Sequence, residues 1–181
     1  MDTVNKIKSI HLEFIDYFKS EGYRYVPPEP LFPSEDKTVA FTNATIIPLK
    51  KYLNQPYAVP GFVVYQPCLR LRNLDSDNYN PQFTSFFRMV SILSHPDVEL
   101  DKVQKIISRY LAEILQIPSD KIILHYSTKV IDLVSDIWKE DYKLEKGNFS
   151  EDFYSWTYGM EGVIGRGITF FVETTYGPRE L

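Results

Sequence analysis

Apolar residues near the N-terminus recur every three to four positions, which is the spacing of one face of a helix. This face consists of Val4, Ile7, His11, Phe14, Ile15 and Phe18. The pattern predicts a helix over residues 3–20, closed by Gly22 and followed by a short strand at 23–26. The prolines at 27–33 then predict an edge or a rigid extended passage, because proline cannot pair within a central strand.

The middle of the chain has the composition of a β-sheet. Three runs rich in Val, Ile, Phe and Tyr lie at 58–71, 83–93 and 121–126. The first two runs are separated by a polar, turn-forming stretch at 72–81. Two strands joined by a loop of this length are expected to pair antiparallel.

The second half of the chain mixes helical and strand patterns. Helical spacing after Asp97 predicts a helix that reaches Ile114, and a shorter helix is predicted at 130–138. Strand patterns return at 153–158 and 168–174. We therefore expect an α+β fold, with an antiparallel sheet flanked by helices, and a single domain. That domain is expected to take up residues 1–181.

Composition narrows the class of protein. The 181 residues are 44% hydrophobic and 24% charged, as in globular proteins, and no apolar run is long enough to span a membrane. A single cysteine, Cys68, excludes a disulfide framework and indicates a cytoplasmic protein. The net charge of −4 excludes a bulk attraction to nucleic acid. The three histidines are scattered, so no metal-binding residues are predicted.

The side chains most suited to binding or catalysis lie at residues 68–72, at the end of the first long predicted strand. Alternation along a strand places Cys68, Arg70 and Arg72 on one face. Cys68 itself is expected to be a buried, inert thiol. Two arginines on one face need anionic partners, because a buried unpaired charge is costly. Those partners are either Asp75 and Asp77, which would make a structural ion-pair cluster, or a nucleoside triphosphate.

The next strand pattern adds an aromatic group to this region. In an antiparallel pair, Phe86 or Phe87 would lie close to a guanidinium group of the first strand. An aromatic ring beside a guanidinium is what a purine nucleotide site requires. The nucleotide interpretation and the ion-pair interpretation both stay open at this level.

Six short motifs occur in order along the chain. They are Gly22-Tyr23-x-x-Val26 with Pro30-Leu31-Phe32-Pro33, Phe41-Thr42-Asn43-Ala44, Gln66-x-Cys68-x-Arg70, Thr84-x-Phe86-Phe87-x-Met89, Ile137-Trp138-Lys139-Glu140, and Trp156-x-x-Gly159-x-x-Gly162-x-x-Gly165. In this order they resemble the N-terminal catalytic core of the alanyl-tRNA synthetase family, which are class II aminoacyl-tRNA synthetases. The resemblance extends over most of the chain and implies the class II catalytic fold.

The resemblance implies roles for particular residues. Arg70 would hold the α-phosphate of ATP and act as the catalytic group. Phe87 would stack on adenine, while Arg72 and Asp75 would complete the ATP site. The amino acid would be bound by a pocket of Trp156, Gly159 and Gly162. The expected ligands are ATP, Mg²⁺ and a small amino acid, with alanine as the first candidate and tRNA as a further partner.

The chain departs from the family pattern at several positions. Arg88 stands where the family has Glu, and Thr169 stands where it has an acidic residue. The run after the motif-two arginine is shortened, and the third class II motif is not found in the 181 residues. Two functions are therefore carried forward. One is ATP-dependent activation of alanine or another small amino acid; the other is an inactive paralogue that acts as a binding, regulatory or complementing subunit.

The predicted sheet also leads us to expect that this chain associates with another protein chain. A sheet that lacks its remaining strands would expose an unpaired edge, and exposed edges favour pairing between chains. This predicts a homodimer or a complex with a partner subunit.

Overall fold

The structure is a computed structural model that describes residues 3–53, 57, 60–71, 84–147, 153–157, 161 and 163–181. The chain divides into two compact units, Met1–Asp97 and Val98–Leu181, which are described separately. The expectation of a single domain stays a prediction.

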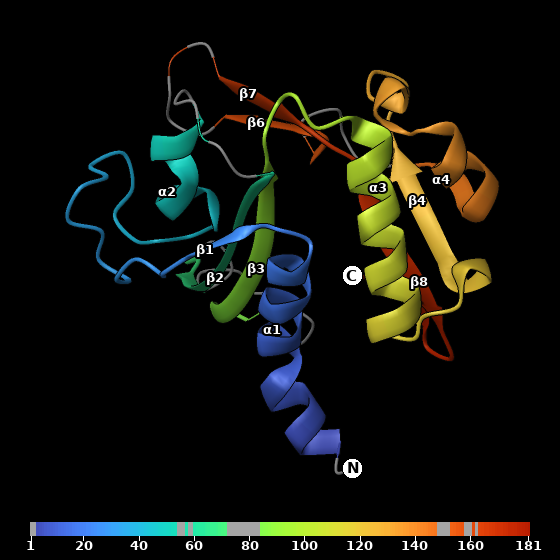
Figure 1. Cartoon of the computed structure of the whole chain (residues 1–181), viewed down its shortest axis with the longest axis horizontal. Helices are drawn as coiled ribbons and strands as arrows, with labels where there is room; N and C mark the ends of the chain where they lie inside the picture. The colour runs from blue at the N-terminus through green and yellow to red at the C-terminus, as the bar shows by residue number, and fades with distance from the viewer. Residues whose placement is uncertain are drawn as a thin grey trace. The chain divides into compact units, whose positions relative to one another are not determined.

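Among its described residues, the first unit has two helices, a 3-10 turn and a three-stranded sheet in the order β1-β2-β3 (Figure 1). In chain order its elements are α1 (Thr3–Ser20), β1 (Arg24–Val26), α2 (Ile46–Leu49), η1 (Lys50–Tyr52), β2 (Gly61–Leu69) and β3 (Phe86–Ser94). The predicted first helix is thus confirmed at both ends. It closes where Gly22 has a φ of +90°, with the Tyr23 N–H donating to the Phe18 carbonyl at 3.0 Å.

Aromatic contacts hold α1 against the sheet. The ring of His11 lies 4.6 Å from that of Tyr65 in β2, and Phe18 is buried edge-on to Tyr23. On the other face of β2, a hydrophobic cluster joins β1, α2 and β2. It consists of Val26, Leu49, Phe62 and Val64, with Ile46, Tyr52, Tyr57 and Leu93 packed around it. Both faces of β2 are therefore covered, which explains its nearly continuous apolar run.

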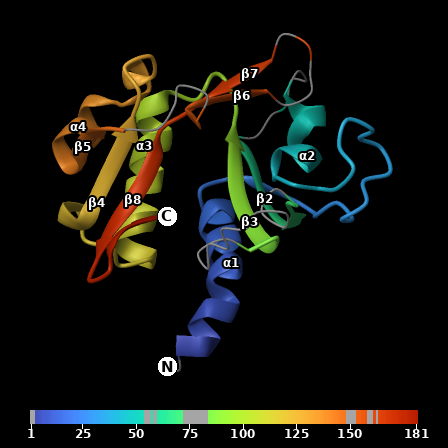
Figure 2. The ribbon, with the colours of Figure 1, turned by 180° about the vertical axis from the view of Figure 1, so that it is seen from behind.

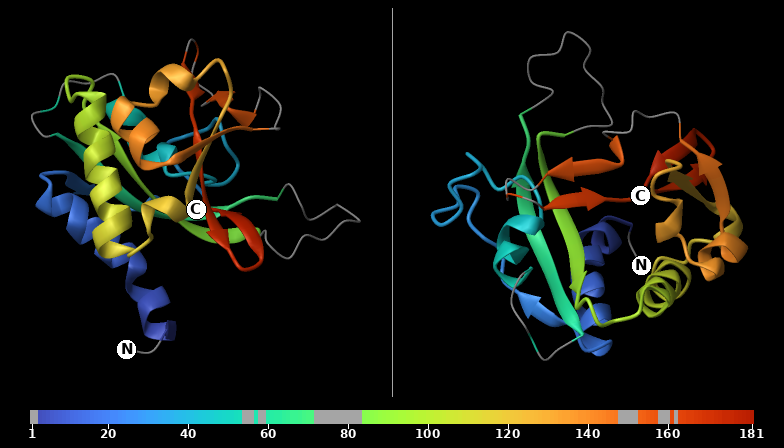
Figure 3. Two further views of the ribbon diagram at one scale, coloured as in Figure 1. Left: turned by 90° about the vertical axis from the view of Figure 1, so that its right-hand side faces the viewer. Right: turned by 90° about the horizontal axis from the view of Figure 1, so that it is seen from above.

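The second unit holds a four-stranded sheet in the order β5-β4-β8-β9 and a separate two-stranded ribbon of β6 and β7 (Figure 3). Its elements are α3 (Leu100–Arg109), η2 (Tyr110–Ile114), η3 (Ser119–Lys121), β4 (Ile122–Tyr126), η4 (Ile131–Leu133), α4 (Asp136–Asp141), β5 (Lys143–Lys146), β6 (Ser155–Thr157), β7 (Ile164–Arg166), β8 (Thr169–Thr174) and β9 (Gly177–Glu180). Helix α3 lies along one face of the β4–β8 pair (Figures 1 and 2).

The architecture is α+β, as predicted, but the two larger sheets are mixed. β2 and β3 pair antiparallel, as the sequence predicted, and so do β4 and β8. β1 instead pairs parallel to β2, and β5 pairs parallel to β4. A long connection in each case returns the chain to the same end of the sheet, which a parallel pair requires.

The helix predicted at 130–138 is divided in two. η4 ends at Leu133, and α4 begins after Ser135, whose hydroxyl accepts a hydrogen bond from the Trp138 N–H at 3.4 Å. Gln104 of α3 fixes the break, because its side chain donates to the Leu133 carbonyl at 2.6 Å and accepts from the Ser135 N–H at 3.0 Å. Within the described ranges, no helix is both long enough and apolar enough to cross a membrane.

Candidate functional site

Arg70 follows the last residue of β2 and lies on the same face of the hairpin as Phe87. The Arg70 N–H donates to the Ser85 carbonyl at 2.8 Å, so the antiparallel pairing continues past the end of the strand. Phe87 is paired with Cys68, which makes it the diagonal neighbour of Arg70. The Arg70 guanidinium carbon lies 5.0 Å from the centre of the Phe87 ring, within the range of a cation–π contact.

The edge of the same guanidinium is held by a backbone group. Nε of Arg70 donates a hydrogen bond to the carbonyl oxygen of Asn43 at 3.0 Å. A ring under the face and a carbonyl at the edge constrain both the position and the rotation of the guanidinium plane. Arginine carries five N–H donors, and this hydrogen bond uses only the one on Nε.

The segment that supplies this carbonyl is tied down by its neighbour, Thr42. Thr42 is fully buried, and its hydroxyl donates to the Pro30 carbonyl at 2.7 Å. Its N–H donates to the Leu31 carbonyl at 2.9 Å, and its own carbonyl accepts from the Leu69 N–H at 2.9 Å. Thr42 therefore joins the proline-rich passage to the end of β2, one residue before Arg70.

Gln66 fastens the proline-rich passage a second time. This buried side chain of β2 donates to the Glu29 carbonyl at 2.9 Å and accepts from the Glu29 N–H at 2.9 Å. Gln66, Thr42 and Asn43 lie within the sequence motifs, but the motifs alone predict no role for these three residues. The signal was the Phe-Thr-Asn-Ala motif itself, in which a small hydroxyl residue sits between an aromatic and a polar residue.

Cys68 lies between Gln66 and Arg70 on the buried face of β2. It is fully buried, and its Sγ contacts the Gln66 carbonyl at 3.5 Å. Burial raises the pKa of the Cys68 thiol to about 11, against a smaller opposing effect of Arg70. The thiol is therefore protonated at neutral pH, and the expectation that Cys68 is buried is confirmed.

Trp156, expected in the amino-acid pocket, belongs to the second unit. It lies in β6 opposite Gly165 of β7, and its side chain packs over Gly167. A Cβ atom at Gly167 would lie 2.6 Å from the indole, so a larger residue at this position would require the ring to shift. Trp156 is 43% exposed.

The structure thus brings together two of the predicted site residues, Arg70 and Phe87. Of the other five, Trp156 is described in the second unit, whereas Arg72, Asp75, Gly159 and Gly162 lie outside the described residues, as does Asp77. In the described part of the chain, no group of three or more His, Cys, Asp and Glu side chains is arranged to hold a metal ion.

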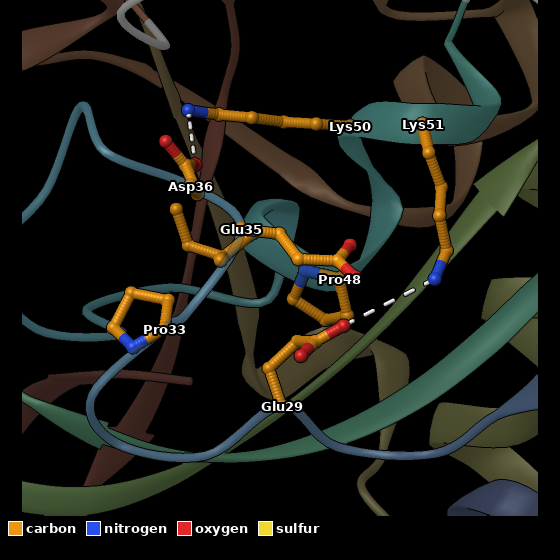
Figure 4. Close-up of a pocket in the computed structure, with 8 residues that line it drawn as sticks. Glu29, Pro33, Glu35, Asp36, Pro48, Lys50 and Lys51 are labelled. Atoms are coloured by element: carbon orange, nitrogen blue, oxygen red, sulfur yellow. Dashed lines mark hydrogen bonds and ion pairs between the residues drawn. The ribbon is translucent and has the colours of Figure 1, made fainter.

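A pocket of about 240 Å³ lies elsewhere in the first unit, lined in part by Glu29, Asp36, Lys50 and Lys51 (Figure 4). Nζ of Lys50 lies 2.7 Å from Oδ2 of Asp36, and Lys51 lies 4.0 Å from Glu29. Burial alone would raise the pKa of Asp36, but hydrogen bonds from Lys50 and Thr38 hold this pKa below its usual range. Because both lysines already face carboxylates, this pocket is less suited to an anion than the Arg70 region.

Comparison with known proteins connects these features to a family. The family model of class II tRNA synthetases (A) matches residues 9–174. An alanine–tRNA ligase of Acidithiobacillus ferridurans is 29% identical over 183 residues, which cover 94% of this chain and 20% of the relative. An alanine–tRNA ligase of Thiobacillus denitrificans is 30% identical over 194 residues, which cover 96% of this chain and 21% of the relative.

A third alanine–tRNA ligase, from Rhizobium johnstonii, is 26% identical over 186 residues, with 96% of this chain and 20% of the relative covered. The chain spans about one fifth of the length of these curated relatives. The matched residues include β2 and β3, the strands next to Arg70 and Phe87, and also β6 and β7, the ribbon that contains Trp156. As the order of its motifs predicted, this chain belongs to the class II (A) tRNA synthetase family.

Proposed function

We propose that this chain binds ATP and activates alanine or another small amino acid as an aminoacyl-adenylate. The observation that carries the proposal is the fixed guanidinium of Arg70, held by the Asn43 carbonyl and the Phe87 ring. Neither partner has a net charge, so these contacts orient the guanidinium without neutralising it. An oriented cation of this kind suits a phosphate group.

In the proposed reaction, a carboxylate oxygen of the amino acid attacks the α-phosphorus of ATP. A new P–O bond forms, the bond to the bridging oxygen of the β-phosphate breaks, and pyrophosphate leaves with the electron pair. Negative charge builds up on the α-phosphoryl oxygens in the transition state. Arg70 would stabilise that charge with N–H donors already in place, which is electrostatic catalysis.

The remaining roles follow the family resemblance. Adenine would stack on Phe87, and Arg72 and Asp75 would complete the ATP site. Trp156, Gly159 and Gly162 would enclose the amino-acid side chain. Mg²⁺ would be held largely by the phosphate oxygens of ATP, as is usual for this ion in nucleotide sites. Transfer of the aminoacyl group to a tRNA is the proposed second step, since the relatives are named alanine–tRNA ligases.

The test is ATP binding to the 181-residue chain, together with alanine-dependent exchange of pyrophosphate into ATP. Arg70→Ala should weaken ATP binding by about 30-fold, because a hydrogen-bonded charged contact contributes roughly 2 kcal/mol. The matched control is Arg88→Ala, which removes an exposed arginine of β3 that is paired with Pro67, one position along from Phe87. Equal losses in both variants would reject the site.

The same experiment separates the two functions considered. ATP binding that depends on Arg70, together with alanine-dependent exchange, supports activation. Binding that depends on Arg70 without exchange would instead favour a binding, regulatory or complementing subunit. The homodimer also stays a prediction, and light scattering of the chain at high concentration tests it.

A further inference from the structure

We infer that Thr42 is a positioning residue for ATP binding, acting through the backbone carbonyl of Asn43 on the guanidinium of Arg70. The inference rests on the proposed function and adds to it a residue that does not touch the nucleotide. It starts from the fact that the Asn43 contact is made by a carbonyl oxygen. The identity of residue 43 therefore matters less than where its backbone is held.

Thr42 has the contacts needed to hold that backbone. Its N–H and its hydroxyl bind two successive carbonyls, those of Leu31 and Pro30, at 2.9 and 2.7 Å. Its own carbonyl accepts from Leu69, the residue directly before Arg70. The chain at 42–43 thus runs beside the chain at 69–70, with one hydrogen bond between backbones and the next to the guanidinium.

The hydroxyl is the part of this arrangement that depends on the side chain. The two peptide hydrogen bonds of Thr42 can form with any residue other than proline, whereas the bond to the Pro30 carbonyl requires a hydroxyl or a similar donor. A buried valine would fill the same space without donating. Without the hydroxyl hydrogen bond, residues 42–43 would no longer be tied to Pro30, and the Asn43 carbonyl could move away from Nε of Arg70.

Thr45 offers a matched control three residues along the same segment. It is also a buried threonine, but its hydroxyl contacts Sδ of Met89 at 3.4 Å and is not joined to Arg70. Thr45→Val therefore makes the same chemical change in the same segment. If the loss of any buried threonine hydroxyl in this segment weakens ATP binding, the dissociation constant should rise equally in both variants.

The experiment measures the dissociation constant of ATP for the whole chain and four variants: Thr42→Val, Arg70→Ala, the double variant, and Thr45→Val. Thr42→Val is expected to weaken binding about fivefold, the effect of one lost hydrogen bond. In the Arg70→Ala background the same substitution should have no further effect, because coupled residues are non-additive. Thr45→Val should stay within about twofold of the wild type.

Each other outcome overturns a defined part of the argument. If Arg70→Ala leaves the affinity unchanged, the proposed ATP site and the role of Thr42 both fail. If Arg70→Ala weakens binding but Thr42→Val does not, the role of Thr42 fails and the ATP site stands. The same conclusion holds if Thr42→Val weakens binding equally in both backgrounds, since it would then act without Arg70.

A second measurement does not depend on the folding of Thr42→Val. Thr42→Cys replaces the hydroxyl with a weak donor of similar size. In the NMR spectrum, the Nε–H of Arg70 should exchange slowly with water in the wild type and at least several times faster in Thr42→Cys. Equal exchange rates in the two proteins would overturn the inference.

Discussion

Two cations of the first unit, Lys50 and Arg70, are held in opposite ways. Lys50 is paired with a carboxylate, Asp36, at 2.7 Å, and the two side chains are only 14% and 15% exposed. Arg70 is exposed, and it is held by a carbonyl and an aromatic ring. The Lys50 contact neutralises a charge, whereas the Arg70 contacts only orient one. The first arrangement stabilises the fold, and the second is suited to receive an anion.

The largest expected effect concerns Lys50. Lys50→Met would leave Asp36 mostly buried without its ammonium partner, so the free energy of unfolding should fall by about 2–3 kcal/mol. The control is the next residue: Lys51 is 51% exposed and lies 4.0 Å from Glu29, so Lys51→Met should cost less than about 0.5 kcal/mol. Urea denaturation measures both. Equal losses would remove the distinction between a structural pair and a surface pair.

An intermediate effect is expected at the ring beneath Arg70. Phe87→Leu should weaken ATP binding by about fivefold, because an aromatic contact with a cation or a stacked base contributes roughly 1 kcal/mol. The control is Phe86→Leu. Phe86 is 54% exposed and is the strand partner of Leu69, whereas Phe87 is the partner of Cys68, so the two rings lie on opposite faces of the hairpin. Phe86→Leu should leave the affinity within twofold of the wild type. Titration calorimetry with ATP distinguishes the two, and a larger effect of Phe86→Leu would move the site to the other face of the hairpin.

The smallest effect is a change with pH. Because the pKa of Asp36 is lower in the folded protein, its pairing adds stability above the unfolded-state pKa of about 3.9. This stability is lost as the pH falls through the lower folded-state pKa. The difference in unfolding free energy between the wild type and Asp36→Asn should therefore be constant from pH 5 to 7 and shrink below about pH 4. A difference that grows on acidification would contradict the pairing.

The hairpin that carries the candidate site could be predicted from sequence because its signal is local. The runs at 58–71 and 83–93 are strongly apolar, and the polar stretch between them favours antiparallel pairing. That pairing is observed, and with it the position of Phe87 beside Arg70. Alternation alone left Phe86 and Phe87 equivalent, because only the observed register assigns each ring to a face.

Other parts of the fold had no comparable signal. β5 reads Lys-Leu-Glu-Lys and β9 reads Gly-Pro-Arg-Glu, so neither has the apolar alternation of a strand. Their pairing with β4 and β8 comes from the tertiary structure. The break in the predicted helix at 130–138 likewise depends on Gln104, a residue distant in sequence.

The least predictable part of the site is the Asn43 contact. Sequence patterns report on side chains, and here the group that holds Arg70 is a backbone carbonyl. Its position depends on Thr42, Pro30 and Leu69 together, which are far apart along the chain. Motif recognition pointed to the segment, but only the three-dimensional arrangement gives the segment a role.

The distribution of tryptophan has a spectroscopic consequence. The chain has two tryptophans, Trp138 and Trp156, and both belong to the second unit. Trp138 is only 4% exposed, whereas Trp156 is 43% exposed, so a soluble quencher such as acrylamide should reach the second fluorophore far more readily. Intrinsic tryptophan emission is therefore a reporter that belongs to the second unit alone. Tyrosine emission and far-UV circular dichroism also include the first unit, so comparing these signals during unfolding shows whether the two units melt together.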